Sequence, residues 1–251
     1  MALQEEFERQ GIWLFKHRSY LPLIALLIGL ILYLRTEMYP QTFILEDEPW
    51  EIYYEMFCLF VSLIGLSIRI YTIGYTPKNT SGRNTKEVQI ADTLNTTGMY
   101  SVVRHPLYLG NFLIWLGIAM LTGNFWFIIA FCLAYGLYYE RIMFAEEQFL
   151  RRKFGDFYLE WAKNVPAFFP KFKNYQKSAL PFSWKKVLRQ EKNGICALFG
   201  IFCIFDLSGE LIERETDYNY FLLVMCLITG TGYLVLKYLK KKTHVLEEEN
   251  R

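Results

Sequence analysis

The sequence predicts an all-α fold: a polytopic membrane helical bundle with about six transmembrane helices and a cytosolic amphipathic helix after the fourth. The chain of 251 residues is 53% hydrophobic and 18% aromatic, yet 21% of it is charged. Apolar and charged residues alternate in separate stretches along the whole length, which is typical of a multi-pass membrane protein. The formal net charge is only +2, which argues against nucleic acid as a main partner, because phosphate binding needs a concentrated basic face.

Six apolar stretches are candidate spans, and they cover residues 20–34, 52–75, 107–121, 125–139, 194–207 and 220–236. Several are shorter than the roughly 20 residues that a perpendicular helix needs, so we expect local thinning or partial insertion. The third and fourth are joined only by Thr122-Gly123-Asn124, which predicts an antiparallel helical hairpin. The chain then divides into residues 1–93 with two spans, residues 94–170 with the hairpin, and residues 171–251 with a basic connector and a C-terminal transmembrane hairpin.

The charges between the spans predict the orientation. Residues 35–51 and residues 206–219 each hold one basic and five acidic residues. Residues 76–106 carry a net charge of +2, residues 140–192 carry +6 and residues 237–251 carry +2. Because basic segments stay in the cytoplasm, both termini and both long loops are predicted to be cytosolic.

Cysteine and histidine offer no sign of a disulfide framework or a metal site. The five cysteines are odd in number, lie in apolar surroundings and form no CxxC pair. Only His17, His105 and His244 are present, and they are too far apart in sequence for a metal site to be inferred from spacing. We therefore predict no metal.

A polar string immediately precedes the third span and includes Arg104-His105-Pro106. Proline suits the first position of a helix, so the helix should begin at Pro106 with His105 as its cap. Such a helix start presents a positive dipole end that suits a carboxylate or phosphate ligand. Gly110 and Gly117 lie seven residues apart and should let another helix approach closely.

A second polar string follows the fourth span, and residues 140–161 should continue it as an amphipathic helix. Glu146 falls within the apolar stripe of this helix, where a carboxylate is costly without a partner or a function. Glu147 and Arg151 have the spacing of an ordinary surface ion pair. A simpler interpretation also stands: Arg104 and His105 as interfacial anchors, and Glu146 extended toward water.

Together these strings resemble the isoprenylcysteine carboxyl methyltransferase and phospholipid methyltransferase superfamily. The matching elements are Arg104-His105-Pro106-Leu107-Tyr108-Leu109-Gly110, Glu146-Glu147, Phe154-Gly155-x-x-Tyr158-x-x-Trp161 and Val165-Pro166-x-x-x-Pro170. They cover about residues 94–170 in the family's order and spacing. Trp161 stands where the family commonly has tyrosine, so no hydroxyl role is carried over to that position.

The resemblance implies an integral membrane enzyme that transfers a methyl group from S-adenosylmethionine to an amphiphilic acceptor entering from the bilayer. The cofactor-binding residues would be His105, Pro106, Leu107, Tyr108, Asn111, Glu146 and Glu147. If the acceptor is anionic, Arg104, Arg141 or Arg151 could hold it, since arginine suits bidentate pairing with an anion. We predict Arg104 or Arg141, which flank the open end of the hairpin, and count both with Glu146 as the catalytic residues. Isoprenylcysteine carboxylates, lipid phosphates, lipid amines and small thiols all remain open as acceptors.

Two other functions also remain open at this stage. Membrane sterol reductases that use NADPH carry a string similar to Arg104–Tyr108, although they tend to be longer and to have more spans. A non-enzymatic scaffold or transporter would place polar residues within several spans and a site at mid-bilayer. Here the charges within the predicted spans are few, Glu55 and Arg69, and the other polar residues of interest gather at one membrane face.

Overall fold

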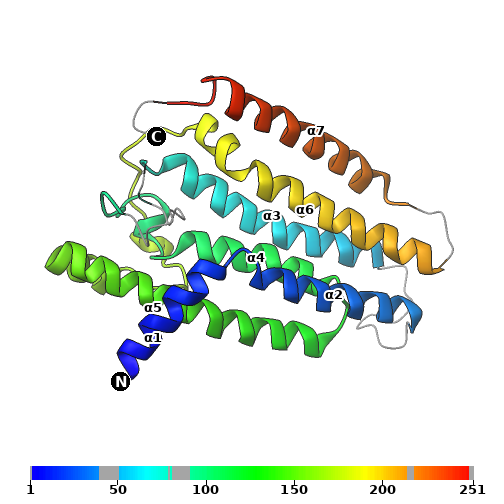
Figure 1. Ribbon diagram of the computed structural model, residues 1–251, viewed down its shortest axis with the longest axis horizontal. Helices are drawn as coiled ribbons and strands as arrows, with labels where there is room; N and C mark the ends of the chain where they lie inside the picture. The colour runs from blue at the N-terminus through cyan, green and yellow to red at the C-terminus, as the bar shows by residue number, and fades with distance from the viewer. Residues whose placement is uncertain (1, 40–50, 79, 81–90, 214–217, 249–251) are drawn as a thin grey trace.

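The computed structural model describes residues 2–39, 51–78, 80, 91–213 and 218–248 (Figure 1). These residues confirm the all-α fold. The helices are α1 (Leu3–His17), α2 (Leu21–Met38), α3 (Glu51–Tyr75), α4 (Pro106–Met120), α5 (Phe125–Asn164), α6 (Trp184–Glu213) and α7 (Tyr220–Lys242). Two short 3-10 turns, η2 (Met99–Ser101) and η3 (Phe172–Asn174), lie in the connections.

Each of the six predicted spans coincides with a helix, but their number as transmembrane spans is not confirmed. Within the described residues, α3, α5, α6 and α7 are long and apolar enough to cross a membrane. The pair α1 and α2, bent by 67°, passes the same test only when taken together. Helix α4 is apolar but has 15 residues, so it is short for a span. The protein is thus an integral membrane protein for which six spans stay a prediction.

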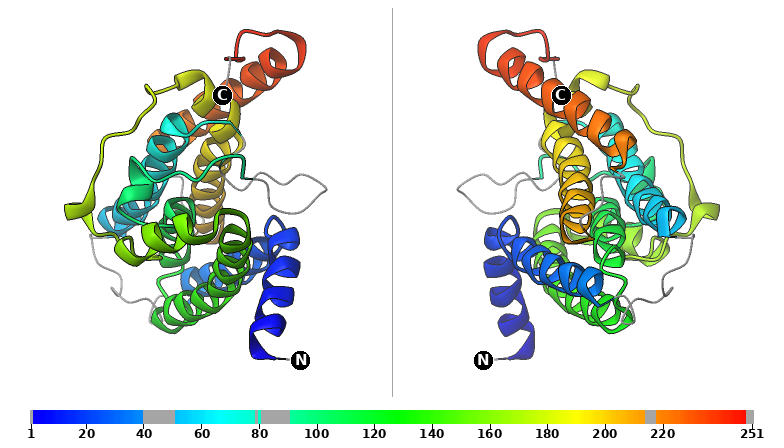
Figure 2. Two further views of the ribbon diagram at one scale, coloured as in Figure 1. Left: turned by 90° about the vertical axis from the view of Figure 1, so that its left-hand side faces the viewer. Right: turned by 90° about the vertical axis from the view of Figure 1, so that its right-hand side faces the viewer.

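The helices α3 and α4 lie at the centre of the bundle, flanked by α6 and α7 on one side and by α5 on the other (Figure 1). Helix α1 packs against α5, and α2 packs against α6 (Figure 2). The start of α4, the end of α3, the start of α6 and the end of α7 lie at one end of the bundle. The α4–α5 turn lies at the opposite end. Of the predicted external segments, residues 40–50 and 214–217 lie outside the described residues.

Close contact between α3 and α4 depends on glycine, as the sequence predicts. A Cβ atom added at Gly110 would lie 2.8 Å from the carbonyl oxygen of Gly65, and one at Gly117 would lie 3.0 Å from the backbone nitrogen of Ser62. The Ser62 hydroxyl also donates a hydrogen bond to the Ile114 carbonyl across the same contact, at 2.9 Å. The two backbones therefore touch directly, which fixes the position of α4 in the bundle.

Helix α5 continues past the apolar stretch, as predicted, but it is kinked within its polar half. Gly155 has φ 55° and ψ −131°, a conformation that side chains with a Cβ rarely adopt. The kink redirects the last part of the helix, and Tyr158, three residues later, is fully buried. At the other end of α5, the Asn124 side chain accepts a hydrogen bond from the Phe127 amide and closes the hairpin turn.

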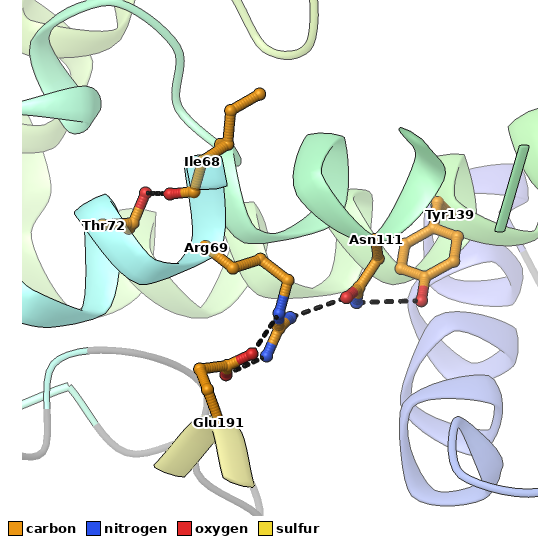
Figure 3. Close-up of polar contacts among 6 residues, drawn as sticks. All are labelled: Ile68, Arg69, Thr72, Asn111, Tyr139 and Glu191. Carbon is orange, nitrogen blue, oxygen red and sulfur yellow. Dashed lines mark hydrogen bonds and ion pairs between the residues drawn. The ribbon is translucent and has the colours of Figure 1, made fainter. Parts of the chain in front are cut away.

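A buried ion pair ties α6 to α3 (Figure 3). The Arg69 guanidinium donates to both carboxylate oxygens of Glu191, at 3.0 and 2.5 Å. The Glu191 side chain is 3% exposed. Helix α6 begins ten residues before the predicted apolar stretch at residue 194, and this added segment carries Glu191 into the bundle. Such a paired geometry offsets the cost of burying two charges in apolar surroundings.

We expect Gly117→Ala to destabilise the protein, because the new methyl group would collide with α3. The loss should be about 1 to 3 kcal/mol and should lower the unfolding temperature in detergent. Gly136→Ala on α5 is the matched control, since no atom lies within 4 Å of its added Cβ. That control should be neutral or gain up to about 1 kcal/mol from helix propensity. Equal melting of the two variants would contradict the close α3–α4 contact.

We also expect Glu191→Gln to destabilise the protein by about 3 kcal/mol, because it leaves the Arg69 charge without its ionic partner. Thermal unfolding in detergent measures the loss. Glu140→Gln is the control: Glu140 also pairs with an arginine, Arg141, but its side chain is 62% exposed, and its loss should cost less than about 1 kcal/mol. A Glu191 variant that melts like the Glu140 variant would show that the buried pair contributes nothing.

Candidate active site

The candidate site is built around the start of α4. The helix begins at Pro106, and His105 is its N-cap, as the sequence predicts. The imidazole of His105 is buried, with the residue 6% exposed. Because the backbone of His105 is extended out of helical geometry, its ring can turn toward α5 rather than continue along α4.

Two adjacent carboxylates of α5 meet this helix start. The His105 Nε2 atom lies 3.1 Å from an oxygen of Glu147, and its Nδ1 atom lies 3.7 Å from an oxygen of Glu146. The Arg104 guanidinium donates to the second oxygen of Glu147 at 3.2 Å. Consecutive residues on one helix thus face the two ring nitrogens of the same histidine, and Glu147 is within hydrogen-bond distance of it.

Tyr108 links this polar group to an aromatic cluster. Its hydroxyl donates to Glu146 at 2.8 Å, and its ring stacks on His105 with the ring centres 5.6 Å apart. The Tyr135 hydroxyl donates to the Tyr108 carbonyl at 3.0 Å, and Tyr139 packs against the Tyr108 ring. Glu146 therefore has the partner that its position on an apolar stripe requires.

The segment after α5 holds the Arg104–His105 turn from outside. The Arg104 amide donates to the Pro166 carbonyl at 2.8 Å, and the His105 amide donates to the Ala167 carbonyl at 3.3 Å. Tyr158, buried beyond the Gly155 kink, lies against Glu147 and Arg104. The four strings that are separate in sequence thus meet in one place.

A cavity of about 390 Å³ opens beside these residues. Helix α4 contributes to its wall, together with residues just before α4, and Glu146 contributes from α5. Residues from α3, α6 and α7 complete it, together with Arg18 at the end of α1. The lining consists of Arg18, Arg69, Ile73, Tyr100, Arg104, His105, Pro106, Leu107, Tyr108, Asn111, Glu146, Arg189, Gln190, Glu191, Lys192, Asn193 and Lys240.

Two features of the wall bear on its electrostatics. Burial of the Tyr100 phenol, followed by the nearby Glu146 carboxylate, raises its pKa well above the usual range, so it stays a neutral donor. Asn111 accepts from Arg69 at 2.6 Å and donates to Tyr139 at 3.5 Å, so it links the α3–α6 ion pair to the aromatic cluster (Figure 3).

Most of the predicted site residues are brought together. His105, Pro106, Leu107, Tyr108, Asn111, Glu146 and Arg104 line the cavity. Glu147 stands behind it and holds the turn. The predicted surface pairing of Glu147 with Arg151 is wrong, because the helix turns Glu147 inward to Arg104 and His105.

Within the part of the chain that the structure describes, Arg141 does not line the cavity. Its guanidinium lies 3.3 Å from the ring centre of Phe7 on α1, and it pairs with Glu140 at 3.5 Å. The reason is the packing of α1 on this face of α5.

The sequence did not predict the part of the cavity wall that lies outside the two polar strings around His105 and Glu146. Arg69 was visible as a charge within an apolar stretch, but its partner Glu191 was assigned to the loop before the fifth span. An arginine buried within a membrane span requires an acidic partner. That requirement could have indicated that an acidic residue such as Glu191 lies close to Arg69. Lys192 and Lys240 carried no signal beyond the basic composition of their segments.

The chain is similar to known methyltransferases over part of its length. The family model described as phospholipid methyltransferase matches residues 56–156. The protein-S-isoprenylcysteine O-methyltransferase of Schizosaccharomyces pombe is 40% identical over 77 residues, 31% of this chain and 33% of the relative. The protein-S-isoprenylcysteine O-methyltransferase B of Arabidopsis thaliana is 40% identical over 79 residues, 31% of this chain and 39% of the relative.

The cobalt-zinc-cadmium resistance protein CzcN of Cupriavidus metallidurans is 39% identical over 85 residues, 34% of this chain and 39% of the relative. The chain thus spans well under half the length of these curated relatives. No solved structure matches. The family match includes α4, the Arg104–His105 turn and the Glu146–Glu147 pair, which together form the core of the candidate site. Through residues 56–156, therefore, this chain is similar to the phospholipid methyltransferase family, and part of that segment is also similar to isoprenylcysteine O-methyltransferases.

Proposed function

We propose that this protein is a membrane methyltransferase that uses S-adenosylmethionine and an amphiphilic acceptor from the bilayer. The observation that carries the proposal is the grouping of His105, Tyr108 and Glu146 on one cavity wall at the start of α4. The similarity of residues 56–156 to the phospholipid methyltransferase family supports a methyl transfer at this place. The proposal places the cavity and both chain ends on the cytosolic side, in keeping with the basic loops.

The residues of the wall suit the chemical groups of S-adenosylmethionine. The cofactor has a positive sulfonium and an ammonium group, for which the Glu146 carboxylate and the ring face of Tyr108 are suitable neighbours. It also has a carboxylate, which the positive helix start at Pro106 and Leu107 and the Arg104 side chain suit. The cavity of about 390 Å³ is of the size class of small-molecule sites.

When bound, S-adenosylmethionine supplies an electrophilic methyl group, and transfer of that group to the acceptor breaks the carbon–sulfur bond and leaves a neutral thioether. The protein's part is to align the two reactants and to exclude water. Glu147 acts behind the wall: it holds His105 and Arg104, so that the wall keeps its shape. Arg104 is the better placed of the two predicted acceptor-binding arginines, because it lines the cavity and Arg141 does not.

The acceptor is an amphiphile in this proposal because the cavity stands beside apolar helices. An acceptor with an anionic oxygen needs no general base, since it is already a nucleophile. An amine acceptor would have to lose a proton, and the nearest carboxylate on the wall is Glu146.

We expect Tyr108→Phe and Glu146→Gln each to weaken binding of S-adenosylmethionine by about tenfold or more, because each removes a charge-assisted hydrogen bond from the wall. His105→Ala should have at least as large an effect. Titration calorimetry on the full chain in detergent measures the affinity, and NADPH is titrated in parallel.

Glu140→Gln is the control for this experiment, since Glu140 stands on the same helix with an exposed side chain. It should bind the cofactor like the unaltered protein. Unchanged affinity in all three wall variants would sink the proposal, as would binding of NADPH in place of S-adenosylmethionine.

A further inference from the structure

The second wall of the cavity comes from the two C-terminal helices. Residues 189–193 near the start of α6 and Lys240 near the end of α7 line the cavity opposite the start of α4. Both helices lie beyond residue 156, where the family match ends. This wall therefore lies outside the segment that matches the family.

The cavity is strongly basic. Six cationic side chains line it: Arg18, Arg69, Arg104, Arg189, Lys192 and Lys240. Two acidic side chains line it, Glu146 and Glu191. Glu191 already forms an ion pair with Arg69 through two hydrogen bonds. Arg104 is paired with Glu147 behind the wall. Lys192 and Lys240 bring two of the six positive charges to the cavity from α6 and α7.

Lys192 and Lys240 form a pair among these cations. They stand on neighbouring helices, and their ammonium groups are close enough to interact electrostatically. Lys192 is 8% exposed, and its Nζ donates to the Arg189 carbonyl at 2.9 Å. Among the residues that the structure describes, no carboxylate lies within ion-pair distance of either lysine. Two like charges held together in this way favour an anion between them, because an anion cancels their repulsion.

The position of Lys240 on α7 indicates what kind of anion it would bind. Lys240 lies in the last turn of α7, after the apolar part of that helix. Helix α7 is a candidate membrane span, so we expect this end of it to lie at the membrane surface. A molecule with an apolar tail in the bilayer could therefore carry a charged head to Lys240 at the cavity.

We propose that Lys192 and Lys240 bind the anionic head, a phosphate or carboxylate, of the amphiphilic methyl acceptor. This inference rests on the proposed methyl transfer and narrows its acceptor to anionic amphiphiles. It assigns α6 and α7 the role of selecting the acceptor, while the start of α4 and Glu146 hold the methyl donor. The alternative for Lys240 alone is a positively charged anchor at the membrane surface, a role that Lys241 and Lys242 would share equally.

The test measures binding of dihexanoyl phosphatidate, an anionic lipid, to the full chain in an uncharged detergent. Dihexanoyl phosphatidylcholine is the zwitterionic comparison, and inorganic phosphate tests whether the anion alone suffices. The unaltered protein should bind the phosphatidate at least about tenfold more tightly than either comparison, since charge and tail act together.

The double variant Lys192→Gln/Lys240→Gln should lose about tenfold or more in phosphatidate affinity and keep its affinity for S-adenosylmethionine. Lys192→Arg/Lys240→Arg should restore phosphatidate binding. Lys241→Gln is the matched control on α7 and should bind like the unaltered protein. Lys240 is exposed, so Lys240→Gln alone should fold normally and show a smaller loss of affinity, of about threefold.

Three results would overturn the inference. The first is unchanged phosphatidate affinity in the double variant, and the second is an equal loss in Lys241→Gln. The third is a loss of affinity for S-adenosylmethionine with phosphatidate affinity intact, which would assign the lysines to the donor. Failure of the proposed function looks different: the unaltered protein would not bind S-adenosylmethionine, while the lysine-dependent binding of phosphatidate would persist.

Discussion

The contact between the Glu146–Glu147 pair and the Arg104–His105 turn is the interaction on which the site depends. It joins α5 to the start of α4 at the open end of their hairpin, 38 to 43 residues apart in the chain. Glu147 fixes the turn, and Glu146 is left on the cavity side with Tyr108 as its partner. The kink at Gly155 and the segment at Pro166 then close around the same turn, so that the motifs form one structural unit.

The two walls of the cavity differ in charge, and the binding roles proposed for them follow from that difference. The family segment supplies a carboxylate, a histidine and aromatic rings, which suit a positively charged methyl donor. The C-terminal helices supply lysine and arginine, which suit an anion. The Arg69–Glu191 pair holds these two parts in register, because it bonds α3 to α6 and reaches Asn111 on α4 as well.

Much of this arrangement was accessible from the sequence. Periodicity and proline placement predicted the α4 start at Pro106, and two glycines spaced by seven predicted the close α3–α4 contact. The residues of the motifs could be grouped into one candidate site because they are local in sequence. Glu191, Lys192 and Lys240 were not, since their role depends on how α6 and α7 dock, and docking is set by tertiary packing. Arg141 shows the reverse case: it is near the motif in sequence, but α1 covers it.

The most direct test of the account is transfer of an isotopically labelled methyl group. Purified protein in membranes is given S-adenosylmethionine labelled in its methyl group, and the lipid and protein fractions are then analysed by mass spectrometry. The account predicts label in an anionic amphiphile, present with the unaltered protein and absent with Glu146→Gln. Folded protein that binds the donor but leaves every lipid and lipidated fraction unlabelled would contradict it.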